Sequence, residues 1–331
     1  MRPRPAAVLA IAMMLLMQGC SGAHAPEPAA PNPPSSGSTK TTDPTRAPAP
    51  QRLVVATEPW RLPYPLAREA VVPVSGSFVV AGGLVAGDRS TDQVFTLDPG
   101  TGHTRAAAPL AVPVHDTAGI AFQGRLLVVG GGNATEQDVV QVRIGKRWSV
   151  AGHLPQPRSD LTTAVVGPLA LVLGGYDATT VAVPSVLAST DGAHWRALGN
   201  LPVPVRYAAG VARGHAVWLF GGERAGVMQT AVQRVDASGR ARVVARLPQA
   251  LGHASAVALG ARILLVGGRT ASTAVTARMW WFDPASRSFT RAGRLPRPLS
   301  DSAVAVGPDG AYLVGGESPS LTDRVVRVVL R

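Results

Sequence analysis

Six residues able to hold a ligand or exchange a proton recur at one fixed place, fourteen positions before the first glycine of a Gly-Gly pair. They are Arg68, Asp116, Asp160, Tyr207, His253 and Asp301. Guanidinium, carboxylate, phenol and imidazole groups together can bind a polar small molecule or transfer a proton. The common spacing predicts that the fold gathers these six side chains in one place.

Further polar residues stand beside the six spaced positions or just after the glycine pairs. His115 and Arg206 lie one position before two of the six, and Tyr176, Arg224 and Arg269 follow glycine pairs. We expect both sets of side chains to emerge at the same end of the folded units. The set predicts a site for a small polar ligand or a glycan. The alternative is that these groups satisfy strand ends and bind water.

Local motifs for metal, cofactor or nucleophilic chemistry do not occur. The seven histidines show no HExxH or HxxxH spacing, and no GxSxG is present. The sequence therefore predicts no metal site and no cofactor, and any catalytic cluster would be assembled only by the fold.

The glycine pairs mark a repeat. Each closes an apolar run, as in LLVVGG, AVWLFGG and ILLVGG, and successive pairs lie 44 to 48 residues apart. A phosphate-binding glycine loop needs a helix after the glycines, whose N-terminus faces the anion. Here β-branched and aromatic residues follow instead, for example ASTAVTARMWWFDP, so the pairs indicate a stacked or radial β repeat.

Within each unit, a run of small residues precedes the apolar strand that ends in Gly-Gly, and a third strand then leads through an Asp-Pro or Asp-Gly turn into a fourth. An aromatic residue stands beyond that turn at Trp148, Trp195 and Phe289. The units resemble kelch repeats. The resemblance implies an all-β, six-bladed kelch β-propeller spanning residues 51–331, with the six spaced residues ringed around one mouth of its central channel.

The two ends of the repeat region complete each other. The chain stops at DRVVRVVLR, a third strand without a fourth, whereas Arg52 to Thr57 reads as a fourth strand without its first three. We expect this N-terminal strand to complete the last blade, since closure leaves only short protected edges. Copper oxidases related to galactose oxidase need a cysteine cross-linked to tyrosine, and the repeat region has no cysteine.

The first fifty residues differ in composition. Residues 1–19 combine Arg2 and Arg4 with a short apolar stretch, and Cys20, the chain's only cysteine, follows. This pattern resembles a bacterial lipoprotein signal with Cys20 as the lipidated residue; a secretory peptide with an incidental cysteine is the alternative. Residues 20–50 are rich in Pro, Ala and Ser and predict a disordered tether. The expected location is the outer face of a bacterial membrane.

Charge narrows the choice of partners. From residue 51 onward, 28 Arg and Lys stand against 18 Asp and Glu. A basic exported domain attracts anionic lipid headgroups, wall polymers or acidic glycans, whereas the expected compartment argues against nucleic acid.

Two functions compete. The first is a membrane-anchored binding or scaffold module for a glycan, a cell-envelope polymer or a protein partner. The second is a carbohydrate isomerase resembling the kelch sialate mutarotases, which would use arginines and acids at the channel mouth for proton transfer. The residues do not identify a catalytic set, and a binding role without catalysis is the first interpretation.

Overall fold

The structure is a computed structural model that describes residues 52–177, 179 and 181–331. The predicted signal peptide (1–19), Cys20 and the tether (20–50) lie outside the described residues. Every regular element within the described ranges is a β-strand. Within those ranges there is no helix long and apolar enough to cross a membrane.

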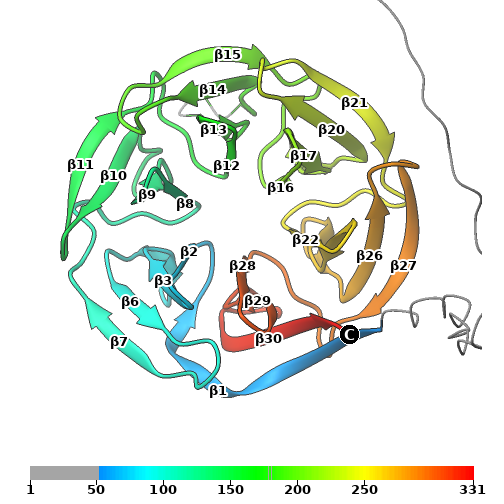
Figure 1. Ribbon diagram of the computed structural model, residues 1–331, viewed down its shortest axis with the longest axis horizontal. Helices are drawn as coiled ribbons and strands as arrows, with labels where there is room; N and C mark the ends of the chain where they lie inside the picture. The colour runs from blue at the N-terminus through cyan, green and yellow to red at the C-terminus, as the bar shows by residue number, and fades with distance from the viewer. Residues whose placement is uncertain (1–51, 178, 180) are drawn as a thin grey trace, which may run out of the picture. The chain divides into compact units, whose positions relative to one another are not determined.

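Six four-stranded antiparallel sheets stand around a central axis as the blades of a propeller (Figure 1). The all-β, six-bladed fold expected from the repeat is thus confirmed. Blades 1 to 3 consist of β2 (Ala70–Val74), β3 (Ser77–Ala81), β6 (Val94–Leu97) and β7 (Thr104–Ala107); β8 (Ala118–Phe122), β9 (Arg125–Val129), β10 (Val139–Ile144) and β11 (Arg147–His153); and β12 (Thr162–Val166), β13 (Leu169–Leu173), β14 (Ser185–Ser189) and β15 (Arg196–Asn200).

Blades 4 to 6 repeat the same order from the channel outward. They consist of β16 (Ala209–Arg213), β17 (Ala216–Phe220), β20 (Ala231–Asp236) and β21 (Ala241–Arg246); β22 (Ser255–Leu259), β23 (Arg262–Val266), β26 (Arg278–Asp283) and β27 (Ser288–Arg294); and β28 (Ala303–Gly307), β29 (Gly310–Val314), β30 (Thr322–Leu330) and β1 (Leu53–Leu66). Short two-stranded ribbons follow three of the glycine pairs: β4 (Leu84–Val85) with β5 (Arg89–Ser90), β18 (Glu223–Arg224) with β19 (Val227–Met228), and β24 (Arg269–Ala271) with β25 (Ala274–Val275).

Blade 6 is closed by the N-terminal strand, as the sequence predicts. Leu53 to Thr57 pair without interruption with Val326 to Leu330, next to each other in Figure 1. The strand is longer than the expected 52–57: β1 continues to Leu66, with two irregularities in its register. The extension carries the chain from the rim toward the start of blade 1.

The apolar core lies between neighbouring blades. Each middle strand is buried on both faces, as in β17, where all five residues are buried. Between blades 4 and 5 the rings of Phe220, Phe282 and Phe289 pack against one another, with centroids 4.8 to 6.4 Å apart. Such interdigitated apolar faces explain why the sequence reads as continuous apolar runs rather than strict alternation.

The glycine pairs join each blade to the next. In all six pairs both glycines have positive φ, 57° to 65° for the first and 96° to 110° for the second. The amide of the second glycine donates a hydrogen bond of 2.7 to 3.0 Å to a carbonyl in the segment that enters the following blade. The last of these, Gly316 N–H to Leu66 O, runs from blade 6 to the chain entering blade 1 and closes the ring.

Substitution of a glycine at this junction tests the contact. A Cβ at Gly315 (φ +57°) would overlap the Leu66 carbonyl oxygen, whereas Gly145 has nearly the same φ (+59°) and open space around it. Gly145→Ala should cost about 1 kcal/mol, the ordinary price of that conformation. Gly315→Ala should cost at least about 2 kcal/mol more in chemical denaturation, because backbone must move. Equal losses in the two variants would contradict close approach at the junction.

Candidate functional site at the channel mouth

The six spaced residues form a ring at one mouth of the channel. Each has a left-handed backbone, with φ from 50° to 61°. Hydrogen bonds of 2.9 to 3.1 Å join consecutive members from backbone N–H to backbone C=O. These bonds run from Asp160 to Asp116, Tyr207 to Asp160, His253 to Tyr207, Asp301 to His253 and Arg68 to Asp301.

The left-handed conformation belongs to the architecture. It is uncommon for residues other than glycine and often accompanies function. Here all six blades adopt it regardless of side chain, because it turns each amide toward the preceding blade. The function of the mouth must therefore be argued from its side chains.

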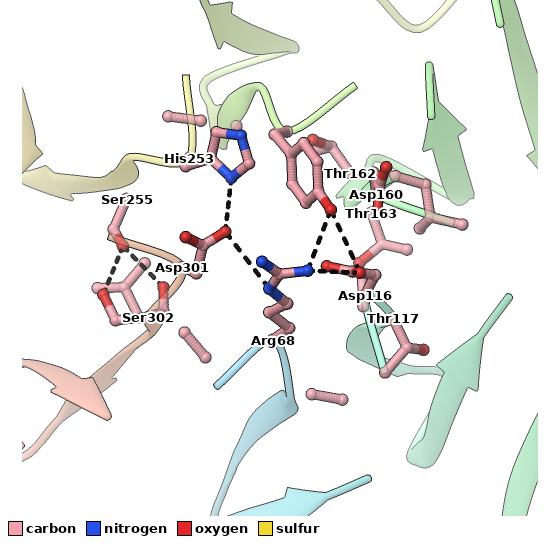
Figure 2. Close-up of a pocket in the computed structure, with 18 of the residues that line it drawn as sticks. Arg68, Asp116, Thr117, Asp160, Thr162, Thr163, His253, Ser255, Asp301 and Ser302 are labelled. Atoms are coloured by element: carbon pink, nitrogen blue, oxygen red, sulfur yellow. Dashed lines mark hydrogen bonds and ion pairs between the residues drawn. The ribbon is translucent and has the colours of Figure 1, made fainter. Parts of the chain in front are cut away.

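Arg68 lies at the centre of the side-chain network (Figure 2). Its Nη1 lies 3.2 Å from Asp116 Oδ2 and 3.4 Å from the Tyr207 hydroxyl. Its Nη2 lies 3.0 Å from Glu317 Oε1, and Nε lies 3.8 Å from Asp301 Oδ1. One guanidinium thus connects side chains from four blades.

His253 is held between two carboxylates. Nδ1 lies 2.6 Å from Asp301 Oδ1, Nε2 lies 3.3 Å from Glu223 Oε2, and the ring stacks on Tyr207 at 3.8 Å. Burial opposes the charged form, yet the hydrogen bonds to Asp301 and Glu223 raise the pKa of His253 above its ordinary value. Burial alone would raise the pKa of Asp301, but His253, Arg68 and Arg269 lower it to about 2. The geometry favours an imidazolium between two carboxylates.

Arg206 and Arg269 are paired in the same way. Arg206 Nε lies 2.9 Å from Glu223 Oε1 and Nη1 lies 3.5 Å from Asp160 Oδ2, with the guanidinium 4.4 Å above the Tyr176 ring. Arg269 Nη2 lies 2.9 Å from Asp301 Oδ2 and 2.5 Å from Glu317 Oε2.

Asp160 differs from the other acids of the ring. Its side chain is 2% exposed, and Oδ1 has no hydrogen-bond partner in the described part of the chain. Burial, and after it the charge of Asp116, raises the pKa of Asp160 well above its usual value. Of the ring's acids, Asp160 is therefore the one that burial most disposes to hold a proton, and it is the ring's best candidate for a proton donor.

The remaining predicted residues take two different positions. His115 lies beside the ring, with Nε2 3.4 Å from Asp116 Oδ2 and Nδ1 2.8 Å from Ser90 Oγ. Arg224 is exposed in the β18–β19 ribbon and makes none of the side-chain contacts of the ring. The structure thus places nine of the eleven predicted residues in the ring or in direct contact with it, and Tyr176 joins them through Arg206.

Two hollows make the mouth accessible. One, of about 220 Å³, lies in the channel and is lined by the ring residues and the inner strands. The other, of about 460 Å³, is lined by Arg68, Leu84, Asp88, His115, Arg269, Glu317, Ser320 and Leu321. The second falls within the size range of small-ligand sites, roughly 300 to 1,000 Å³.

Basic and acidic side chains are paired at the mouth. The basic groups are Arg68, Arg206, Arg269 and His253, and the acidic groups are Asp116, Asp160, Glu223, Asp301 and Glu317. Each arginine lies within 4 Å of at least one carboxylate. The mouth is a self-paired ionic network, which offers donors and acceptors side by side. Over the ranges described, there is no cluster of His, Cys, Asp and Glu suited to a metal ion.

Glu69 is a polar residue of the mouth region that sequence reasoning missed. It follows Arg68 and is 4% exposed, and both of its carboxylate oxygens lack a hydrogen-bond partner among the described residues. A Cβ at Gly315 would lie 3.3 Å from its Oε1, which places the carboxyl at the junction of blades 6 and 1. Burial, only partly offset by the amides of Glu69 and Ala303, raises its pKa to about 8. The other units carry Thr, Leu, Ala, Ala and Ser at this position. The single carboxylate among these small or apolar residues is the feature of the sequence that could have singled out Glu69.

The fold, the glycine pairs and the blade order define a six-bladed β-propeller built of kelch-like repeats. The chain is similar to the Kelch repeat protein M-T8 of Myxoma virus (strain Lausanne), at 24% identity over 159 residues, 46% of this chain and 31% of that protein. It is also similar to Kelch-like protein 25 of Xenopus tropicalis, at 27% identity over 154 residues, 45% of this chain and 26% of that protein.

A solved structure described as "Structure of YjhT" shares the fold, with a TM-score of 0.71 and 16% identity over 82% of this chain and 99% of that one. No protein-family model matches the sequence. The two kelch relatives are matched over less than a third of their own lengths.

The buried carboxyl of Glu69 gives a pH-dependent prediction. Its pKa is about 8 in the folded protein and about 4.5 without burial, so the unfolded chain loses the proton first and folding stability falls as pH rises from 4.5 to 8. Glu69→Gln stays neutral, and should therefore match the parent near pH 4 and exceed its unfolding free energy at pH 8, by an amount on the order of 3 kcal/mol.

The matched control is Asp309→Asn, which changes an exposed carboxylate. It should shift stability by less than about 0.5 kcal/mol at both pH values. A Glu69→Gln variant that is no more stable at pH 8 than at pH 4, relative to the parent, would show that this carboxyl finds a partner in solution.

Proposed function

We propose that this propeller is a binding module whose channel mouth recognises an uncharged, hydroxyl-rich ligand, such as a segment of a glycan. The observation that carries the proposal is the pairing of all three mouth arginines with carboxylates. A hydroxyl group both donates and accepts, and so fits a surface on which guanidinium N–H groups and carboxylate oxygens alternate.

The pairing of the mouth arginines with carboxylates argues against an anionic ligand at this site. An incoming carboxylate or phosphate would have to compete with Asp116, Glu223, Asp301 or Glu317 for an arginine. A neutral ligand can bridge an existing pair at lower cost, because neither charge is left unpaired. The Arg68–Glu317 ion pair can be reached by such a ligand. The side chains of Arg68 and Glu317 are 20% and 14% exposed on the wall of the larger hollow.

Asp160 favours one alternative, a carbohydrate isomerase resembling the kelch sialate mutarotases. When protonated, its carboxyl, whose Oδ1 has no hydrogen-bond partner among the described residues, could deliver a proton to a sugar that enters the channel. That reaction class also needs an arginine for the carboxylate of an acidic sugar, and Arg68, Arg206 and Arg269 are each already paired with a carboxylate of the protein. Binding without turnover therefore remains the first proposal, and a protein partner at the loops of this face is a further one.

Glycan binding by the full-length protein tests the proposed site. Neutral glycans should bind in preference to acidic ones on an array. In calorimetry, the Kd should change less than about threefold between low and high salt, because no net charge is neutralised. Glu317→Gln and Arg68→Gln should each weaken binding about tenfold, by leaving a partner unpaired.

The control is Arg224→Gln, on the same face but outside the ring, and it should leave binding unchanged. A preference for acidic sugars with steep salt dependence would contradict the proposal, and no binding to any glycan would put the protein partner first. Accelerated anomer exchange of a bound sugar, abolished by Asp160→Asn, would establish the isomerase instead.

The proposed location is the outer face of a bacterial membrane, through a lipid on Cys20. Support comes from the sequence alone: a basic start, a short apolar stretch, one cysteine and a Pro-rich segment before the propeller. Cys20→Ser should move the protein from the membrane fraction to the soluble fraction of cells. Unchanged membrane association of this variant would exclude the lipid as the anchor.

A further inference from the structure

The net charge of the propeller is concentrated in two of its six blades. Residues 231–297, the outer half of blade 4 and all of blade 5 with their connections, carry eleven arginines and only two aspartates. The rest of the propeller is close to neutral, with seventeen basic and sixteen acidic residues. Arg269 belongs to the mouth network, so ten arginines of this region lie elsewhere.

Strand register places five of these arginines on the two sides of the outer junction between blades 4 and 5, which we call the groove. Arg234 shares a face of β20 with Val232, which packs in the core between blades 4 and 5. Arg278 shares a face of β26 with Trp280 and Phe282, which pack in the same core from the other side. Because side chains alternate along a strand, the two arginines face the same junction from opposite sides.

The outer strands extend both sides of this groove. Arg242 of β21 pairs directly with Arg234, and in β27 Arg294 pairs with Arg278 while Arg291 pairs with Trp280. β20 and β21 form the outer half of blade 4, and β26 and β27 form the outer half of the next blade, blade 5 (Figure 1). The groove arginines are Arg234, Arg242, Arg278, Arg291 and Arg294.

These guanidinium groups have no carboxylate partner among the described residues, unlike those at the mouth. Asp236 and Asp283, the two acids of the region, accept hydrogen bonds from the backbone of their own hairpin turns. Like charges directly opposite each other destabilise a sheet, and two such pairs, Arg234 with Arg242 and Arg278 with Arg294, flank this groove. An external anion would relieve both repulsions.

We propose that the outer groove between blades 4 and 5 binds a linear polymer of repeating phosphate groups. Guanidinium groups bind phosphate through paired N–H donors. The arginines are spread along β27 from Arg294 at its mouth end to Arg291 at its middle, and Arg234 and Arg242 continue the row on blade 4. The three-residue step from Arg291 to Arg294 alone spans about 10 Å, and the row continues on blade 4, which suits successive charges of a chain better than a single ion.

A membrane surface is the less favoured occupant. The groove arginines face one another across a junction, and Val243 is the one large apolar side chain that is clearly exposed within residues 231–297. Peripheral membrane contacts normally insert apolar side chains beside the basic ones. The groove lies on the rim, so this proposal is independent of the ligand at the mouth.

A matched pair of triple variants of the full-length protein tests the groove. Arg242→Gln/Arg291→Gln/Arg294→Gln removes three exposed outer-strand charges from the groove, and Arg105→Gln/Arg147→Gln/Arg196→Gln removes three from blades 1 to 3. The probe is long-chain inorganic polyphosphate, with orthophosphate for comparison. The groove variant should bind polyphosphate at least about tenfold more weakly and lower the slope of log K against log salt by about two to three, whereas the control variant should change affinity less than about twofold.

Unchanged thermal unfolding of both variants is required for the comparison. Equal losses in the two variants would overturn the proposal, because they would indicate diffuse attraction to net charge. Groove-dependent binding to phosphatidylglycerol vesicles without binding to polyphosphate would assign the groove to a membrane surface, and a preference for DNA over polyphosphate would also contradict it. Glu317→Gln, which alters the mouth, should leave polyphosphate binding intact. The groove proposal and the proposed glycan site at the mouth can therefore fail independently of each other.

Discussion

The hydrogen bond from the second glycine of each pair to the backbone of the following blade is the contact on which the propeller depends. It occurs six times at 2.7 to 3.0 Å, and the sixth, from Gly316 to Leu66, joins the last blade to the first. Only a residue without a side chain fits there, because the backbone has positive φ and the neighbouring carbonyl lies within reach of any Cβ. The same geometry places one residue of each unit in the ring at the mouth.

This architecture separates charge into two environments. At the mouth, residues from all six blades converge, and arginines meet carboxylates that are distant in sequence, as Arg68 meets Asp116 and Glu317. At the rim of blades 4 and 5, arginines stand opposite one another on neighbouring strands, as Arg278 stands opposite Arg294. A balanced network suits a neutral hydroxyl-rich ligand, and an unpaired row of guanidinium groups suits a polyanion. One chain could therefore hold two chemically different partners without competition.

Much of the fold could be predicted from sequence, because the same strand and turn pattern recurs in six units. The fixed spacing of the glycine pairs gives the blade count, and the unfinished strands at the two ends of the repeat region give the closure of blade 6. The position of the ring follows too, since the distance from Asp160 to Gly174 equals that from Asp301 to Gly315. The continuation of β1 to Leu66 was not predicted, because its register with β30 is irregular.

The partners of the ring residues could not be predicted in the same way. A lone Arg68 in the sequence looks like an anion-binding group, and only the closed ring shows that Asp116, Asp301 and Glu317 already surround it. The groove arginines were counted as general surface charge, because their common face depends on bulged strand pairs. Glu69 was missed for a related reason, since its burial arises where the last blade meets the first.

Amide hydrogen exchange at the six second glycines tests the closed ring most directly. The account predicts that the amides of Gly83, Gly131, Gly175, Gly222, Gly268 and Gly316 exchange together, with the protection of global unfolding, because each donates the same hydrogen bond in one cooperative ring. Markedly faster exchange at Gly316 than at the other five would show that the junction of blades 6 and 1 opens independently, and would contradict the account.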